Sequence, residues 1–240
     1  MSMAERENTP VDSRELSPTL RAVLQSAAKL QEIVPDAVLV GGSAAALYAG
    51  HRDSFDHDHV LQDLVDRYGI VLDAVEASEG WATSIRSSKP PFTVLGSLDG
   101  VEAGLRQLRR SLPVETTEYD LGDGRTVVVP TLEETLRIKA YLVVQRNAVR
   151  DYLDVVALVE TLGLEGAVQV LRDMDTYYVD RSDTDESVLT TLILRLTTPE
   201  PKDPEVTTQL KTYKSLVPRW QEWGAVEDAC HELAQSLAEH

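Results

Sequence analysis

The chain has 240 residues, of which 42% are hydrophobic and 26% are charged, a composition typical of a globular protein with one large core or two smaller ones. No apolar run approaches the ~20 residues of a membrane span, and the charged first residues lack the apolar stretch of a signal peptide, so we expect a cytoplasmic protein without a membrane partner. The single cysteine excludes an internal disulfide, and the net charge of −17 opposes long-range attraction of nucleic acid.

The first half of the chain alternates between helix and strand signals. Residues 1–15 are expected to be disordered, and Ser17 followed by Pro18 predicts the start of a helix. A short strand at 37–40 leads into a turn at Gly41, Gly42 and Ser43, and then into an alanine-rich helix that Gly50 can end. An amphipathic helix, bent at Gly69, is predicted over 60–78.

Five candidate strands follow, and the rest of the chain reads as helical. The strands are predicted at 82–87, 92–97, 101–108, 114–121 and 125–130. Thr131 and Glu134 form a capping-box pattern at the start of the helical part, whose later helices are predicted at 164–175, 185–196, 204–216 and 218–238. The fold class is therefore α/β (α+β): a mixed-sheet core over 16–130 and a helical C-terminal half over 131–240 that completes the site.

The most informative residues are two acids that follow the Gly-Gly-Ser turn. Asp56 and Asp58 are two residues apart, so on a strand they share a face and can bind one cation. Mg²⁺ prefers oxygen ligands and commonly combines one or two carboxylates with water and substrate phosphates. A glycine-rich turn at a helix N-terminus exposes N–H groups to an anion. The pattern indicates a nucleoside triphosphate on the turn with its metal on the next strand, while the alternative is a helix cap before a polar loop.

These residues resemble a known signature. Gly41-Gly42-Ser43, the acids Asp56 and Asp58, the "GHR.S" at 50–54 and the later "K......R...RD..D" at 139–154 are similar to the AbiEii-type toxin nucleotidyltransferases of the polymerase-beta-like superfamily, which include the MenT-like toxins. The resemblance covers about Val38 to Leu162. It implies transfer of a nucleotidyl group from an NTP with two Mg²⁺ ions, in some members onto the tRNA 3′ end, by a toxin paired with an antitoxin.

The resemblance also implies roles for single residues. It assigns the terminal phosphates to Ser43, the metals to Asp56 and Asp58, the triphosphate to Lys139 and the late acidic position to Asp154. Arg52 and Arg146 match basic positions that we expect to contact the nucleotide. Glu102, in a candidate strand, is the best-placed acid for a third metal ligand.

Several features leave alternatives open. His57 and His59 stand where apolar residues are usual, and we expect them to pack half-exposed on the side away from the acids. A straight helix would separate Lys139 from Asp154 by ~22 Å, so the helix must break near Asn147 if both serve one site. Asp151 and Asp154 are alternatively acids at a helix start. Four aromatic residues fit packing better than base stacking: Trp220, Trp223, Tyr177 and Tyr178.

The sequence is compatible with more than one acceptor for the nucleotidyl group and with a module that has no catalytic activity. Residues 106–150 contain eight basic and six acidic side chains, which makes this segment the candidate patch for tRNA. A small-molecule nucleotidyltransferase of the antibiotic-modifying kind suits the negative charge better, and a non-catalytic nucleotide-binding module is a third possibility because of the two histidines. In each case a triphosphate needs its turn, metal ligands and lysine together, so Ser43, Asp56, Asp58 and Lys139 are expected to line one cleft.

Overall fold

The computed structural model describes residues 16–179 and 187–239, which divide into two compact units. The sheet unit comprises Asp53–Thr131 and the described part of Asp12–Leu47. The helical unit comprises Tyr48–Arg52 and the described part of Leu132–His240, so it includes a short segment from the middle of the first half of the sequence. The N-terminal residues that we expect to be disordered lie outside the described residues. No helix within 16–179 and 187–239 has the length and apolar character needed to cross a bilayer.

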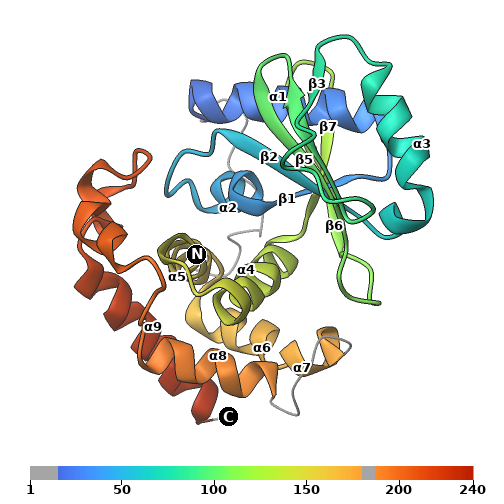
Figure 1. Ribbon diagram of the computed structural model, residues 1–240. Coiled ribbons are helices and arrows are strands. Elements are labelled where there is room, and N and C mark those ends of the chain that lie inside the picture. The colour runs from blue at the N-terminus through green and yellow to red at the C-terminus, as the bar shows by residue number, and fades with distance from the viewer. Residues whose placement is uncertain (1–15, 180–186, 240) are drawn as a thin grey trace, which may run out of the picture. The chain divides into compact units, whose positions relative to one another are not determined.

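Two sheets form the sheet unit (Figure 1). Five strands lie in the order β1-β2-β5-β4-β3, with β2 and β5 parallel and the other neighbours antiparallel, and β6 and β7 form an antiparallel pair. The mixed sheet confirms the predicted fold class. The strands are β1 (Val38–Val40), β2 (Asp56–Leu61), β3 (Trp81–Thr83), β4 (Thr93–Leu98), β5 (Val101–Gln107), β6 (Thr116–Asp120) and β7 (Thr126–Pro130).

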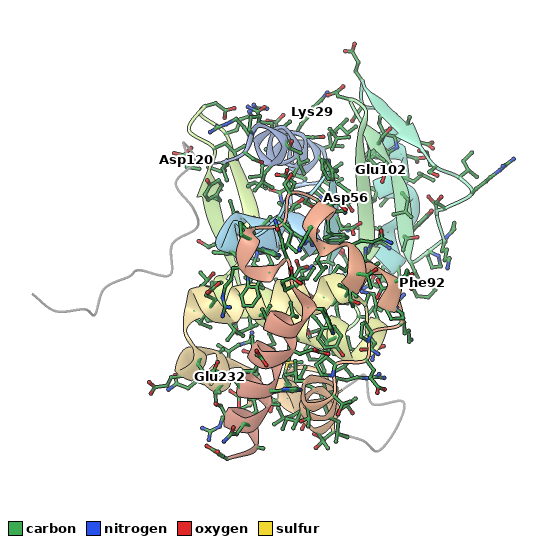
Figure 2. All side chains as sticks on the ribbon, turned by 90° about the vertical axis from the view of Figure 1, so that its left-hand side faces the viewer. Lys29, Asp56, Phe92, Glu102, Asp120 and Glu232 are labelled. Atoms are coloured by element: carbon green, nitrogen blue, oxygen red, sulfur yellow. The ribbon has the colours of Figure 1, made fainter. Side chains whose placement is uncertain are left out.

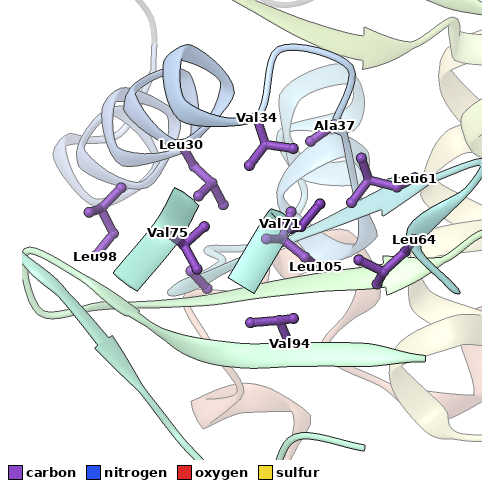
Figure 3. Close-up of a cluster of buried hydrophobic side chains, with 11 residues drawn as sticks. Leu30, Val34, Ala37, Leu61, Leu64, Val71, Val75, Val94, Leu98 and Leu105 are labelled. Atoms are coloured by element: carbon purple, nitrogen blue, oxygen red, sulfur yellow. The ribbon is translucent and has the colours of Figure 1, made fainter. Parts of the chain in front are cut away.

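One face of the five-stranded sheet packs against the helices α1 (Pro18–Ile33) and α3 (Leu64–Glu76). The Ser17 hydroxyl accepts a hydrogen bond from the Leu20 amide at 3.1 Å, which confirms the predicted cap. Figure 3 shows the apolar cluster between these helices and strands β2, β4 and β5, which includes Leu30, Val71, Val94 and Leu105. Each fully buried side chain of this size contributes about 2 kcal/mol through the hydrophobic effect.

Strand β2 is buried on this core side and open on the other. His59 and Leu61 are buried, whereas Asp56 is exposed and Asp58 is half-buried. This alternation is the period of two that a strand imposes. The helix predicted from residue 60 begins only at Leu64, because β2 continues to Leu61, and its distortion lies at Arg67, whose φ is −122°, rather than at Gly69.

The helical unit consists of short helices in series (Figure 1). In chain order they are α4 (Leu132–Arg146), α5 (Val149–Leu162), α6 (Leu164–Leu171), α7 (Met174–Tyr177), α8 (Val188–Thr197), the 3-10 helices η3 (Pro204–Thr212) and η4 (Pro218–Trp220), and α9 (Trp223–Ala238). The helical segment predicted at 204–216 is present as a 3-10 helix and ends earlier, at Thr212; its β-branched residues disfavour a regular α-helix.

The aromatic residues of the helical unit are packing residues, as predicted. Trp220 is buried. The rings of Tyr178 and Tyr141 stack with centroids 3.8 Å apart, and Trp223 makes an edge contact with Tyr152 at 5.9 Å. Rings held in this way are not available to stack on bases.

Candidate functional site

The two acids of the sequence motif lie where the pattern predicted, at the start of β2. Because side chains alternate along a strand, Asp56 and Asp58 point to the face opposite the apolar core. The Ser54 hydroxyl lies 3.4 Å from Oδ1 of Asp56, a weak contact, and Asp56 remains exposed. We call this side of β2 and β5 the acidic face.

Glu102 lies on the acidic face as well. It is the register partner of Asp56 on the parallel strand β5, and it is exposed. Figure 2 labels both residues among the side chains of the sheet unit. Among residues 16–179 and 187–239, however, no group of three or more His, Cys, Asp or Glu side chains is arranged to hold a metal. Metal binding by Glu102 therefore stays a prediction.

The Gly-Gly-Ser turn begins helix α2 (Gly41–Ala49) beside these acids. Gly41 has a φ of +82°, which favours glycine, and a Cβ there would come within 3.6 Å of Cβ of Asp58. The first turn of α2 therefore lies against Asp58, with Gly42 as its second residue. Its backbone N–H groups are of the kind that bind phosphate at a helix N-terminus.

Ser43 has a local structural role. Its side chain is buried, and its hydroxyl donates a hydrogen bond of 2.6 Å to the Asp56 carbonyl. This bond ties the start of α2 to the start of β2. Phosphate binding by the Ser43 hydroxyl, which stays a prediction, requires that this bond be given up.

Asp58 has a partner that the sequence did not indicate. The Nε of Arg106 on β5 donates a hydrogen bond of 3.0 Å to Oδ1 of Asp58. Both side chains are partly exposed. Arg106 is two positions beyond Gly104, the register partner of Asp58, and only the register of β2 on β5 brings the pair together. A single sequence does not contain that register.

The acidic face suits a hard divalent cation. Asp56 and Asp58 offer carboxylate oxygens on one side of one strand, and Asp56 is open to solvent. Mg²⁺ binds such oxygens and retains water or substrate oxygens in its other positions. No imidazole joins the set, because His57 and His59 point to the core side of β2.

The expectation that these two histidines are half-exposed is wrong. Both are buried, with ring centroids 5.2 Å apart, because α1 and the neighbouring strands cover that side of β2. Nε2 of His57 lies 3.0 Å from the Ser26 hydroxyl. Neither ring nitrogen of His59 has a hydrogen-bond partner among the described residues. Burial lowers the pKa of His57 to about 4 and holds the pKa of His59 well below its usual value, so both are neutral at pH 7.

A second group of predicted residues meets in the helical unit, around the carboxylate of Asp154. Arg52 donates two hydrogen bonds to it, from Nε to Oδ1 at 2.9 Å and from Nη2 to Oδ2 at 3.0 Å. Nζ of Lys139 lies 2.7 Å from Oδ2, and Nε2 of His51 lies 2.8 Å from Oδ1. We call these four side chains the Asp154 cluster.

The Asp154 cluster is buried, and Asp154 is its acid. Burial alone would raise the pKa of Asp154, but the charges of Arg52 and Lys139 outweigh it and hold that pKa well below its usual value. Burial lowers the pKa of His51, which the neighbouring Asp154 only partly offsets. The imidazole of His51 is therefore neutral at pH 7, beside the ion pairs that Arg52 and Lys139 make with Asp154.

The chain reverses direction between Lys139 and Asp154, which allows their side chains to form an ion pair. Helix α4 ends at Arg146 and α5 begins at Val149, and Asn147 between them has a φ of 52°. The predicted break near Asn147 is therefore confirmed, and it gives the 2.7 Å contact between Lys139 and Asp154.

Arg146 also lies at this reversal. It binds Asp151 through Nη2 at 2.6 Å and through Nε at 3.2 Å. Asp151 is fully buried in the first turn of α5, which confirms the alternative prediction of an acid at a helix start. Nucleotide contact by Arg146 stays a prediction.

The predicted site residues thus form two local groups. Gly41, Gly42, Ser43, Asp56, Asp58 and Glu102 belong to the sheet unit, and Arg52, Lys139, Arg146 and Asp154 belong to the helical unit. The convergence of Lys139 with the acids on one triphosphate stays a prediction.

Comparison with known proteins identifies a solved structure with a similar fold and several longer proteins with similar sequences. No protein-family model matches the chain. A crystal structure of a "putative nucleotidyltransferase" from H. pylori is similar with a TM-score of 0.50 and 14% identity, over 93% of this chain and 96% of that one. This likeness shows the fold alone.

The relatives are mycobacterial transport proteins. The heme uptake protein MmpL11 of Mycobacterium tuberculosis is 33% identical over 211 residues, which is 78% of this chain. The mycolic acid-containing lipids exporter MmpL11 of Mycolicibacterium smegmatis is 33% identical over 132 residues, which is 55% of this chain. The chain spans 20% of the length of the first and 13% of the second.

Proposed function

We propose that this protein is a Mg²⁺-dependent nucleotidyltransferase that transfers a nucleoside monophosphate from an NTP to an acceptor hydroxyl. The observation that carries the proposal is the placement of Asp56 and Asp58 on one open face of β2, with the first turn of α2 against Asp58. The fold similarity to the H. pylori protein supports it.

The chain's own groups account for substrate binding. The N–H groups at the start of α2 bind phosphate oxygens, and Lys139 is the basic residue that the resemblance assigns to the triphosphate. Asp56 and Asp58 would hold the cations, with Glu102 as a third ligand. Two Mg²⁺ ions, when bound, would neutralise the triphosphate charge and activate the acceptor hydroxyl.

The reaction is an in-line displacement. The acceptor oxygen forms a bond to the α-phosphorus, the bond from that phosphorus to the pyrophosphate oxygen breaks, and the hydroxyl proton passes to solvent or to an acidic-face carboxylate. The residues act by position and charge.

The acceptor we propose is the 3′ hydroxyl of tRNA, with the protein acting as a toxin that a cognate antitoxin restrains. The AbiEii resemblance supports this choice, and so does the local excess of basic residues over 106–150 in an otherwise acidic chain. A small-molecule acceptor is the alternative within the same reaction class.

The test is incubation of the protein with each α-labelled NTP, Mg²⁺ and total tRNA. We expect label to appear in tRNA with one preferred NTP and to disappear in the Asp56→Asn variant. Label in a small-molecule acceptor instead would retain the reaction and replace the acceptor. Absence of labelled product and of pyrophosphate release with every NTP would overturn the proposal.

A non-catalytic nucleotide-binding module, serving transport as the relatives' names suggest, is the second candidate. The observation that favours it is that the Ser43 hydroxyl and the Lys139 ammonium both already have partners within the protein. Calorimetric binding of NTP without pyrophosphate release would support this candidate.

A further inference from the structure

Arg106 and Gly104 give Asp58 a setting that no other acid on the acidic face has. Oδ1 of Asp58 lies 2.4 Å from the place where a Cβ on residue 104 would be, and the same Cβ would lie 2.9 Å from Cδ2 of Leu95. Real Cβ atoms do not approach other atoms so closely. The carboxylate therefore occupies a space that exists only because residue 104 is glycine.

Arg106 holds the carboxylate in that space. Its Nε bonds to Oδ1 at 3.0 Å, while Oδ2 is the oxygen nearer to Gly41, 3.9 Å from the position of a Cβ there. The two oxygens thus have different surroundings. Oδ1 is engaged with a cation of the protein, and Oδ2 faces the first turn of α2.

The terminal nitrogens of Arg106 have no further role in the described part of the chain. No hydrogen bond or ion pair joins its Nη1 or Nη2 to another described residue. Its side chain is 43% exposed, so solvent screens the pair and it contributes little to folding. The main effect of Arg106 is therefore on the charge around Asp58 and not on the stability of the fold.

We propose that Arg106 partly neutralises the Asp58 carboxylate, which Gly104 leaves room for, and that Arg106 thereby sets the metal affinity of the acidic face. The inference rests on the proposed metal-dependent function. Arg106 lowers the negative charge of the face and engages Oδ1 of Asp58, which leaves Oδ2 as the oxygen without a protein cation beside it. A divalent cation therefore binds against the repulsion of the guanidinium. This keeps affinity low until substrate phosphates add their own oxygens.

The test is calorimetric titration with MnCl₂, without nucleotide, of the wild type and of Arg106→Met. We expect the variant to bind Mn²⁺ about fivefold more tightly, since it loses one positive charge a few ångströms from the metal. Arg109→Met is the matched control: it removes an exposed arginine three residues away that has no partner among the described residues. It should change the affinity less than twofold. Affinity in Arg106→Met equal to or weaker than that of the control overturns the inference.

Two further variants separate positioning from general damage. Gly104→Ala displaces the Asp58 carboxylate and should weaken Mn²⁺ binding about tenfold, since a misplaced ligand costs affinity on the scale of an outer-shell mutation. Gly69→Ala, where a Cβ meets nothing within 4 Å, should leave it unchanged. Equal Mn²⁺ binding in these two glycine variants contradicts the role of Gly104.

The outcomes distinguish this inference from the proposed function. If Arg106→Met binds Mn²⁺ more tightly but no NTP is used, the function fails and the inference stands. If transfer occurs and Arg106→Met gains no affinity, only the inference fails. If neither the wild type nor Arg106→Met binds Mn²⁺, both are overturned.

Discussion

Asp56 and Asp58 lie on one face of a strand, where their charges repel; Asp58 is paired with Arg106, whereas Asp56 has only a weak contact with the Ser54 hydroxyl. Asp56 is also the more exposed of the two. This difference gives the two acids different sensitivities. Loss of Asp56 removes a proposed metal ligand, whereas loss of Asp58 also releases Arg106.

Asn replacement of either acid should abolish transfer and keep the fold. We expect Asp56→Asn and Asp58→Asn each to lower the transfer rate by about a thousandfold, since a metal site supplies several kcal/mol of transition-state stabilisation. The melting temperature in metal-free buffer should stay within a few degrees of wild type, as repulsion is relieved. Asp73→Asn, an exposed acid on α3, is the control. Global unfolding of the variants would show that the acids are structural.

Lys139 combines a proposed substrate contact with a buried ion pair. Lys139→Met should weaken NTP use at least tenfold and lower the free energy of unfolding by about 2 kcal/mol, a reduced loss because Arg52 still neutralises Asp154. Lys202→Met removes an exposed cation of the helical unit outside the 106–150 segment and should affect neither quantity. Steady-state kinetics and urea unfolding measure the two effects. Lost stability with unchanged NTP kinetics would leave Lys139 a structural residue only.

The junction between α4 and α5 is the element that builds the Asp154 cluster, and Asn147 holds it. Its Nδ2 donates to the Glu200 carbonyl at 2.6 Å, its Oδ1 accepts from the Tyr152 hydroxyl at 2.5 Å, and its carbonyl accepts from the Lys202 amide at 2.7 Å. With a φ of 52°, the residue directs α5 back so that Asp154 meets Lys139.

Substitution at this junction should separate backbone strain from lost hydrogen bonds. We expect Asn147→Ala to lower the free energy of unfolding by about 3 kcal/mol, from two lost side-chain bonds and an unfavourable φ. Asn147→Gly should lose less, because glycine adopts this φ freely. Chemical denaturation of both variants measures the difference. Equal losses would mean that the φ of residue 147 carries no cost.

Elements with local signals were predictable from the sequence, and long-range pairings were not. The strand of Asp56 and Asp58, the Ser17 cap and the break at Asn147 follow from period, capping and turn chemistry over a few residues. The partner of Asp58 depends on the register of β5, and the burial of His57 depends on α1, which lies about thirty residues earlier in the chain. Such contacts are made by tertiary packing, so a single sequence gives no sign of them.

Within residues 16–179 and 187–239, three buried histidines affect stability in the same direction. Burial lowers the pKa values of His51, His57 and His59 in the folded chain, while the unfolded chain titrates near 6.5. Above pH 6.5 both states are neutral at these positions. Below it, the unfolded state takes up protons that the folded state does not, so stability falls as pH decreases.

We therefore expect the free energy of unfolding to decrease steadily from pH 6.5 to about pH 4, with about 3 kcal/mol of the loss due to His57, whose folded pKa is about 4. Urea unfolding at half-unit pH steps measures the slope. His57→Gln should reduce it, and His231→Gln, at an exposed position, should not. Constant stability between pH 7 and 5 would contradict the burial of neutral imidazoles.

The Asp154 cluster can form only late in synthesis of the chain. His51 and Arg52 leave the ribosome about a hundred residues before the carboxylate that they bind, because the sequence separations are 103 and 102. During that interval two basic groups destined for burial have no Asp154 to bind, and in the finished protein their segment belongs to the helical unit. A nascent chain stalled before residue 154 should therefore keep this segment open to protease, and its protection should appear only after α5 has emerged.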